Sequence, residues 1–333
     1  MSLPTTMHAL QLSEYAGLNA LTLTETPLPQ PGQNEVLVKI LATTANPSDL
    51  HFMKGEYGFT KPLPTVPGFE ACGEVVTAGE GAEALLGQRV ACFAAQDKNG
   101  TWAEYMVTGA NNCFPLQEHV SDEQGTTMLV NPFTALALLN LAQEAEAKAV
   151  AQTAAAGQIG RMVQRLCSDR GIPCVNIVRR EEQVMLLKSE GTQHILNSSD
   201  DGFFDVLRQT CRELKVSYAF DAVGGRITGM LLEAIRRGGT VNVYGVLSGK
   251  PASLNGGQLI FGDKTVTGFW LSRWFARQEH STALDFSSQV QAMLDDTLQS
   301  AIQGHYTLTN ALEGLRTYAD NMTAGKVIIK PNG

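Results

Sequence analysis

A turn at residues 154–160 is the first place in this chain where residue types and spacing could do chemistry. Ala149–Thr153 is a short run suited to a buried strand, and an A-x-x-G-x-x-G turn follows it. Apolar side chains then recur at helical spacing, at Ile159, Met162, Val163 and Leu166. The N-terminus of such a helix offers free N–H groups and a positive dipole end to a pyrophosphate. The turn therefore predicts a nucleotide site with cofactor contacts at Ala156, Gly157, Gln158, Ile159 and Gly160.

Two arginines after the next predicted strand indicate which cofactor binds. The strand is Cys174–Val178, and Arg179 and Arg180 stand where an NAD-specific site places an acidic residue for the ribose 2′-hydroxyl. A planar, permanently charged guanidinium suits a 2′-phosphate instead, so the sequence predicts NADPH. The alternative is an alanine-rich turn between a strand and a helix, followed by two solvated arginines.

The composition is that of a globular protein with more than one core. A chain of 333 residues exceeds the ~100 to 200 residues of one domain, which predicts two domains. Hydrophobic residues make up 44% and charged residues 17%, which excludes a disordered chain. The net charge of −8 disfavours nucleic acid and an anionic membrane as partners. The first residues lack the features of a signal peptide and no apolar run of about 18 residues occurs, so we expect a soluble, cytoplasmic protein.

Cysteine and histidine spacing gives no sign of a metal site. The six cysteines and six histidines are scattered, with no C-x-x-C pair and no H-E-x-x-H. There is also no G-x-S-x-G sequence of an α/β-hydrolase nucleophile. We expect reduced, mostly buried thiols, without a disulfide framework or a structural zinc site.

Residues 7–110 are predicted to form an all-β domain. Short β-rich runs broken by Gly and Pro occupy residues 7–12, 20–29, 35–45, 73–79, 88–94 and 100–108. Between the third and fourth runs, Asn46–Gly68 is a long Pro- and Gly-rich connection of the kind that is usually functional. Ser48 could cap a short helix in it that ends at Gly55.

From Asp122 onward the pattern changes to helix, first over residues 122–145. After the glycine turn, strands predicted at 194–197, 218–223, 240–244 and 265–269 alternate with helices at 203–214 and 226–236. Such alternation predicts a parallel, doubly wound sheet with Gly224, Gly225 and Gly245 at its carboxyl edge, where ligands bind. Helices at 281–304 and 310–321 precede a last strand, 326–330, which we expect to return to the first domain. The predicted class is α/β, with one domain at 1–125 and 300–333 and a nucleotide-binding domain at 126–299.

The β-rich first domain, the A-x-x-G-x-x-G turn and the tail GKVIIKP together resemble the medium-chain dehydrogenase/reductase superfamily over essentially the whole chain. Within it, NPSDLHFMKGEY, VNPFTAL, FDAVGG, GGTVNVYGVLSG and GFWLSRWF look most like the zinc-independent 2-enoyl thioester reductases. Quinone oxidoreductases are the near relatives. The resemblance implies a GroES-like β-rich catalytic domain, a Rossmann domain and a homodimer.

The resemblance also bears on zinc. Zinc-dependent members place Cys where this chain has Ala45 or Asn46, and Gly-His-Glu where it has Gly68-Phe69-Glu70. The lobe that would carry four structural cysteines holds only Cys92 and Cys113. We therefore predict no metal. Without a Lewis acid for an alkoxide, the chemistry favoured is hydride addition to a polarised C=C.

Such a reaction needs an acid that delivers a proton to the α-carbon of the acceptor. By the resemblance, Tyr57 occupies the position of the enoyl reductases' proton-donor tyrosine, and Asn46 lies near the nicotinamide end. A phenol with a pKa of ~10 is a reasonable donor to an enolate carbon. The alternative for Tyr57 is a loop tyrosine whose ring only packs.

Further site residues are expected in the second half of the chain and at its tail. Trp270 matches a family tryptophan that lines the acyl pocket, although its strand could equally pair across a two-fold axis, and Lys326 resembles a lysine that reaches the cofactor. Thr134 is expected to donate to a phosphate or to the nicotinamide amide, or else to cap a helix. Tyr244 and Phe269 are expected to contact the cofactor where their strands end.

The sequence thus predicts an NADPH-dependent, zinc-free reductase, with a trans-2-enoyl thioester as the leading substrate. A quinone or an enal or enone is the alternative acceptor within the same superfamily. A second alternative is an NADPH-binding sensor or structural protein with little activity. Gly58 and Phe59 motivate it, because the family commonly has proline directly after the tyrosine.

Overall fold

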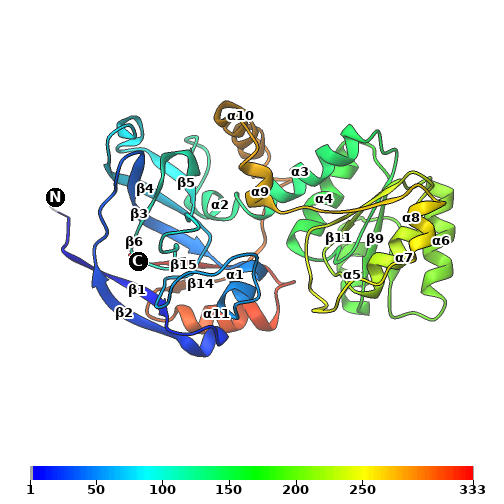
Figure 1. Ribbon diagram of the computed structural model, residues 1–333, viewed down its shortest axis with the longest axis horizontal. Helices are drawn as coiled ribbons and strands as arrows, with labels where there is room; N and C mark the ends of the chain where they lie inside the picture. The colour runs from blue at the N-terminus through cyan, green and yellow to red at the C-terminus, as the bar shows by residue number, and fades with distance from the viewer. Residues whose placement is uncertain (1–2, 333) are drawn as a thin grey trace. The chain divides into compact units, whose positions relative to one another are not determined.

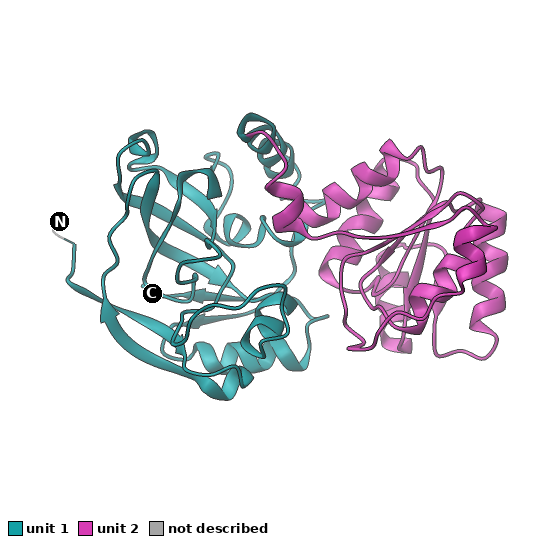
Figure 2. Cartoon of the chain, in the orientation of Figure 1, with its two compact units in different colours: residues 1–132, 280–333 teal, residues 133–279 magenta. Residues whose placement is uncertain are grey.

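The computed structural model of the protein describes residues 3–332 (Figure 1). The chain divides into two compact units (Figure 2). Unit 1 consists of residues 1–132 and 280–333, and unit 2 consists of residues 133–279. The sequence placed the corresponding boundaries at 125/126 and 299/300.

Unit 1 is built on a seven-stranded sheet in which β3 (Glu35–Thr44) pairs with β4, β6 and β15. The six predicted β-rich runs are confirmed as strands. Their bounds, with those of the short strand that the sequence did not predict, are β1 Thr6–Leu12, β2 Leu21–Pro27, β3 Glu35–Thr44, β4 Glu70–Ala78, β5 Arg89–Phe93, β6 Tyr105–Gly109 and β7 Cys113–Pro115. The hairpin of β1 and β2 forms a separate two-stranded sheet.

Alternation along β3 divides the core of unit 1 between two faces. Val36, Val38 and Ile40 belong to a buried cluster on one face of the sheet. Leu37, between them, belongs to the larger cluster that also buries Trp102. This period of two is what a strand covered on both faces requires.

The C-terminal strand returns to unit 1, as predicted. β15 (Lys326–Lys330) pairs antiparallel with β3, with Ile329 opposite Thr43. The continuous helix predicted at 281–304 is wrong, because α10 ends at Gln291 and residues Ile302–Thr307 form β14, parallel to β15. Edge pairing with a strand distant in sequence overrides the local helical pattern there.

Four helices of unit 1 have the bounds α1 Pro47–Met53, α2 Asp122–Thr127, α10 His280–Gln291 and α11 Ala311–Asp320. The cap of α1 is Asn46 and not Ser48, since the Asn46 N–H donates to the carboxylate of Asp49 at 2.8 Å. No helix within residues 3–332 is long and apolar enough to cross a bilayer.

Unit 2 has a six-stranded, all-parallel sheet of order β10-β9-β8-β11-β12-β13. The bounds are β8 Val150–Gln152, β9 Cys174–Val178, β10 Ile195–Asn197, β11 Tyr218–Asp221, β12 Thr240–Val243 and β13 Thr265–Gly268. The order reverses between β8 and β11. This reversal is the point at which open parallel sheets bind ligands, outside the carboxyl ends of the strands.

Helices cover both faces of this sheet, so the predicted doubly wound fold is confirmed. Val175 and Ile177 of β9 pack in one cluster with α6 and α7, whereas Val178 packs on the other face with Leu187 of α5. The helix bounds are α3 Asn131–Glu144, α4 Gln158–Asp169, α5 Glu181–Ser189, α6 Phe203–Leu214, α7 Arg226–Ala234, α8 Gly256–Ile260 and α9 Leu271–Phe275.

Candidate active site

The glycine turn, residues 154–160, lies directly after β8 at the point where the strand order reverses. Ala154, at the first position of the motif, has a φ of +51°, a left-handed conformation that glycine adopts without strain. The N–H of Gly157 donates to the Ala154 carbonyl at 2.8 Å and closes the turn. Gly157 is also the N-cap of the twelve-residue helix α4.

Gly160 lets α4 approach the strand end more closely than any other residue would. A Cβ at this position would lie 2.6 Å from both Cα and the carbonyl oxygen of Ala155, which are backbone atoms that cannot move aside. Gln152 fixes the same approach, because its buried side chain donates to the Gly160 carbonyl at 2.8 Å. This packing holds the first turn of α4 at the carboxyl edge of the sheet, where it fits a pyrophosphate.

A buried carboxylate that the sequence analysis did not single out fixes the neighbouring strand end. Oδ1 of Asp221, the last residue of β11, accepts from Thr153 Oγ1 at 2.8 Å and from the N–H groups of Val223 and Gly224 at 2.9 and 3.2 Å. Its Oδ2 accepts from Thr228 Oγ1 at 2.6 Å. Asp221 thereby ties the ends of β8 and β11 together. The available signal was an acidic residue followed by two glycines at a strand end.

Tyr244 and Phe269 both lie at this carboxyl edge, directly after β12 and β13. The Tyr244 N–H donates to the Asp221 carbonyl at 2.9 Å, and the Phe269 N–H donates to the Val243 carbonyl at 2.8 Å. Burial, and then the negative charge of Asp221, raise the pKa of the Tyr244 phenol. Trp270 follows as the half-buried N-cap of α9. Thr134 is buried in α3.

Arg179 and Arg180 are both exposed directly after β9. Their main-chain N–H groups donate to the side-chain oxygen of Gln183 at 3.1 and 3.3 Å, and Ser199 Oγ donates to the Arg179 carbonyl at 2.8 Å. Neither guanidinium has a hydrogen-bond or ion-pair partner among residues 3–332. The backbone is therefore held while both cationic groups stay available.

In unit 1, the carboxylate of Glu70 is the centre of a fully buried polar network. Its Oε1 accepts from Asn46 Nδ2 at 2.9 Å and from Lys326 Nζ at 3.3 Å. Its Oε2 accepts from the N–H groups of Leu129 and Val130 at 3.1 and 2.8 Å. These bonds use the main chain between α2 and α3, which explains why the single helix predicted at 122–145 is wrong and breaks there.

All three donors of the Lys326 ammonium are used inside this network. Besides Glu70, the ammonium donates to the Ala45 carbonyl at 3.1 Å and to Asn46 Oδ1. A direct bond from Lys326 to a cofactor would therefore require that one of these be released. The same holds for Asn46, whose amide bonds both Glu70 and Lys326.

Asp49 adds a second buried carboxyl group next to this pair. Burial raises its pKa to about 7, against the opposing effects of the hydrogen bond from the Asn46 N–H and the charge of Lys326. Burial likewise lowers the pKa of Lys326, partly offset by Glu70 and Asp49. Asp49 Oδ1 has no hydrogen-bond partner among residues 3–332. No sequence motif indicated Asp49, because its neighbours come from distant strands.

Tyr57 is half-buried and packs against the core of unit 1. Its ring centroid lies 5.1 Å from that of Phe69 and 5.3 Å from that of Phe59. Phe69 directly precedes Glu70, so the structure brings the tyrosine and the Asn46–Glu70–Lys326 network to one region. The Tyr57 ring therefore packs against two phenylalanine rings, and such packing is compatible with both interpretations of this tyrosine.

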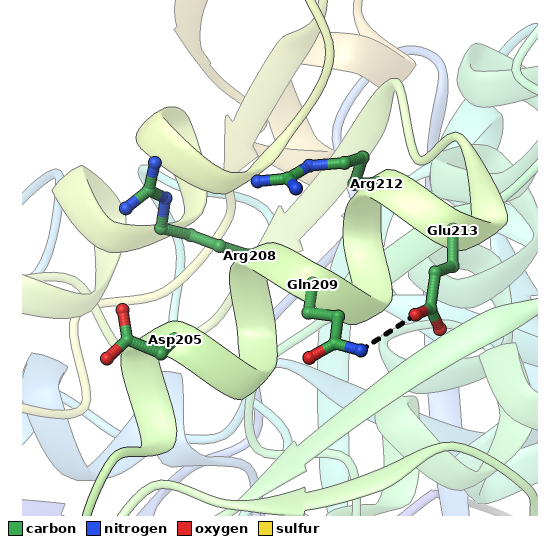
Figure 3. Close-up of a pocket in the computed structure, with 5 residues that line it drawn as sticks. All are labelled: Asp205, Arg208, Gln209, Arg212 and Glu213. Atoms are coloured by element: carbon green, nitrogen blue, oxygen red, sulfur yellow. Dashed lines mark hydrogen bonds between the residues drawn. The ribbon is translucent and has the colours of Figure 1, made fainter.

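A surface hollow on unit 2 is a different feature. Its lining consists of Asp205, Arg208, Gln209, Arg212 and Glu213, all on α6 (Figure 3). Gln209 donates to Glu213 at 2.9 Å within this lining. A mixed-charge face of one helix without any predicted site residue does not make a catalytic site.

Comparisons with known proteins agree with this geometry. Residues 32–118 match the alcohol dehydrogenase GroES-like domain, and residues 159–289 match the zinc-binding dehydrogenases. A mitochondrial enoyl-acyl-carrier-protein reductase of Caenorhabditis elegans is 32% identical over 257 residues, which are 75% of this chain and 72% of the relative. The solved structure of a candidate NADPH:quinone reductase from Mesorhizobium loti has a TM-score of 0.92 at 32% identity, and the match covers 99% of this chain and 100% of that one. A mycobacterial protein solved with NADPH has a TM-score of 0.82 at 25% identity, over 98% of this chain and 100% of its own.

The chain therefore belongs to the medium-chain dehydrogenase/reductase superfamily, as its sequence indicated. Within that superfamily it is an oxidoreductase of the enoyl reductase and quinone oxidoreductase branch. The GroES-like and Rossmann folds expected from the resemblance are both confirmed.

The zinc in the family description does not fit the residues of this chain. Within residues 3–332, no three His, Cys, Asp or Glu side chains gather as metal ligands. At the site network, the Asn46 side chain is bonded to an ammonium, and a buried ammonium repels a second cation. The residues of this network therefore do not fit a zinc ion.

Replacing Lys326 by Met should lower the free energy of unfolding by about 3 to 5 kcal/mol, because Glu70 and Asp49 would stay buried without their cation. Adding Glu70→Gln to Lys326→Met should recover part of the loss. Lys330→Met is the control, since that ammonium forms an exposed pair with Glu123 and is worth at most about 1 kcal/mol. Urea unfolding at neutral pH measures all three. Equal losses in the two single variants would contradict the importance of the buried network.

Proposed function

We propose that this protein is an NADPH-dependent reductase that adds hydrogen across a polarised C=C, most favourably that of a trans-2-enoyl thioester. The observation that carries the proposal is the glycine turn held by Gly160 at the strand-order reversal, followed by two available guanidinium groups. The curated relative named above as an enoyl reductase supports the thioester as acceptor.

The cofactor would be held by unit 2. The N–H groups at the start of α4 face the carboxyl edge and suit the pyrophosphate, and Arg179 and Arg180 suit the 2′-phosphate. Tyr244 and Phe269, which both lie at this edge, would flank the rest of the cofactor. When bound, NADPH supplies the hydride for the β-carbon of the acceptor.

Tyr57 would supply the proton for the α-carbon. Phe59 and Phe69 pack against its ring, which would hold the hydroxyl in place. An acid held in place gains rate mainly by staying within reach of the atom it protonates. Trp270 would contact the acyl part of a thioester substrate.

A quinone or enone acceptor is the second candidate, favoured by the names of the solved relatives. It needs the same hydride and no acyl channel. Binding of NADPH without chemistry, as in a sensor, is the third candidate.

The cellular compartment also stays a prediction. The relative's name gives mitochondria for that protein, and a cytoplasmic location is our proposal for this chain.

The proposed homodimer would form through β13, the edge strand of the unit 2 sheet. Its residues are mostly exposed, and an edge strand offers unpaired N–H and C=O groups to a second copy. Large apolar side chains are exposed just before it, including Ile260 at 73% and Phe261 at 76%. Exposed apolar residues beside an open edge are typical of an interface.

Replacing Arg179 and Arg180 by Ala should weaken NADPH binding about 10- to 100-fold and change NADH binding little, because charge-assisted hydrogen bonds contribute about 1.5 to 3 kcal/mol. The matched control replaces Arg236 and Arg237, an exposed pair that precedes β12 and so lies at the amino edge. Titration of cofactor fluorescence measures each affinity. Equal losses for NADPH and NADH would remove the 2′-phosphate assignment.

The Tyr57→Phe variant should lose about 10² to 10⁴ in kcat with NADPH affinity unchanged, the range expected for a general acid. Tyr105→Phe, which removes another phenol of unit 1, is the control. NADPH oxidation at 340 nm with a short trans-2-enoyl-CoA, a small quinone and an alkenal measures the rates. Turnover of the quinone or alkenal alone selects the second candidate, and no turnover of any acceptor beside tight NADPH binding selects the third.

Replacing Ile260 and Phe261 by Asp should convert the dimer to a monomer. The new carboxylates of the two copies would repel one another across the two-fold axis, and burying them in the interface would be costly. Light scattering on a size-exclusion column gives the mass. Met185→Asp, at an exposed apolar position on α5, is the control. A monomeric wild-type protein at micromolar concentration would refute the β13 interface.

A further inference from the structure

The segment that carries Tyr57 contains a buried lysine without a role in the proposed reaction. We call residues 54–69, between α1 and β4, the Tyr57 loop. Lys61 in this loop is only 7% exposed, although lysine is among the residues least often buried. Such burial needs compensation from the groups around it.

The main chain of Lys61 is fixed by one hydroxyl group. Tyr15 Oη accepts from the Lys61 N–H at 2.6 Å and donates to the Lys61 carbonyl at 2.7 Å. Tyr15 also packs edge-on against Phe52 of α1, with ring centroids 5.9 Å apart. The loop is thus joined at Lys61 to the segment after β1.

The ammonium of Lys61 is held by a different part of unit 1. It donates to the carbonyls of Ala95, at 3.0 Å, and Lys98. It also lies 5.9 Å from the ring centroids of both Phe52 and Phe59, within range of a cation–π interaction. Three sequence segments therefore converge on one side chain.

Phe59 connects this anchor to Tyr57. The Phe59 ring contacts both sides of this connection: its centroid lies 5.9 Å from the Lys61 ammonium and 5.3 Å from the Tyr57 ring centroid. It also lies 5.8 Å from the Phe69 ring centroid. The far end of the loop is held independently, since Thr65 exchanges main-chain hydrogen bonds with Leu12 at 2.7 and 3.1 Å. Within residues 57–64, Lys61 has hydrogen bonds from both its main chain and its side chain to segments outside the loop.

We propose that Lys61 is a positioning residue for Tyr57, which it acts on through Phe59 by anchoring the loop to Tyr15 and to the carbonyls of Ala95 and Lys98. This inference rests on the proposed role of Tyr57. It assigns Lys61 no contact with substrate or cofactor. Its function is to keep the phenol where the acceptor can reach it.

The charge of Lys61 gives the anchor a pH dependence with a definite sign. Burial lowers its pKa to about 8, opposed by Asp97 and Asp49, and a lysine exposed by loop opening has a pKa of about 10.4. The open loop therefore binds the proton more tightly, so closure becomes more favourable as pH rises above about 8. The other groups nearby are the Tyr15 phenol and the exposed Lys98–Glu35 ion pair. Linkage predicts that the equilibrium constant for opening the loop falls roughly 25-fold between pH 7 and pH 9.5.

The test combines loop exchange with kinetics on the full chain. In Lys61→Met, hydrogen exchange of residues 55–63 should accelerate, and kcat should fall about 10- to 100-fold with NADPH affinity unchanged, as expected when a catalytic group loses its position. Lys61→Arg keeps a cation at every pH. After correction for intrinsic exchange rates, hydrogen exchange of the loop should slow between pH 7 and pH 9.5 in the wild type but not in Lys61→Arg. Lys98→Met removes a neighbouring ammonium but keeps the Lys98 carbonyl, and should behave as wild type.

The outcomes separate this inference from the proposed function. Wild-type exchange in Lys61→Met, or the same pH response in Lys61→Arg as in wild type, overturns the anchor whether or not Tyr57 is the acid. A wild-type kcat in Tyr57→Phe would instead overturn the role of Tyr57 as proton donor, and with it the positioning role of Lys61. The exchange data would still decide whether Lys61 orders the loop. A faster loop with an unchanged kcat also overturns the positioning role.

Discussion

Unit 1 depends on one physical constraint. The carboxylate of Glu70 is buried, so both of its oxygens must accept hydrogen bonds from the protein. Its two oxygens take donors from Asn46, Lys326, Leu129 and Val130. A carboxylate removed from water is tolerated only when paired and hydrogen-bonded. The loop after β3, the last strand and the end of α2 are therefore held at one point.

The same network decides the chemistry that this unit can support. A zinc-dependent relative would need anionic or neutral ligands facing an open position, whereas here an ammonium lies among the polar groups. Burial disfavours the charged form of Lys326 and lowers its pKa, whereas the negative charge of Glu70 favours that form. The charges of this network are therefore held by fixed hydrogen bonds among its own buried groups.

Unit 2 was largely predictable because its signals are local. Strand β9 and helix α6 have the bounds that the sequence predicted, because the pattern of each is contained in its own segment. The elements that were missed or wrong depend on contacts outside their own segment. β14 forms because β15 lies beside it, and the helix after Asp122 breaks because Glu70 takes the N–H groups of Leu129 and Val130.

By itself, the sequence determined the fold class, the glycine turn and the arginines after β9, because each is encoded within one short segment whose spacing has a direct geometric meaning. Only the tertiary structure decided the rest. Asn46, Glu70 and Lys326 are separated by up to 280 positions, yet their side chains bond one another. Asp221 and Lys61 likewise acquire their partners only when distant strands and loops meet. The interactions of a buried charge depend on its distance in space from other groups, and that distance cannot be read from spacing along the chain.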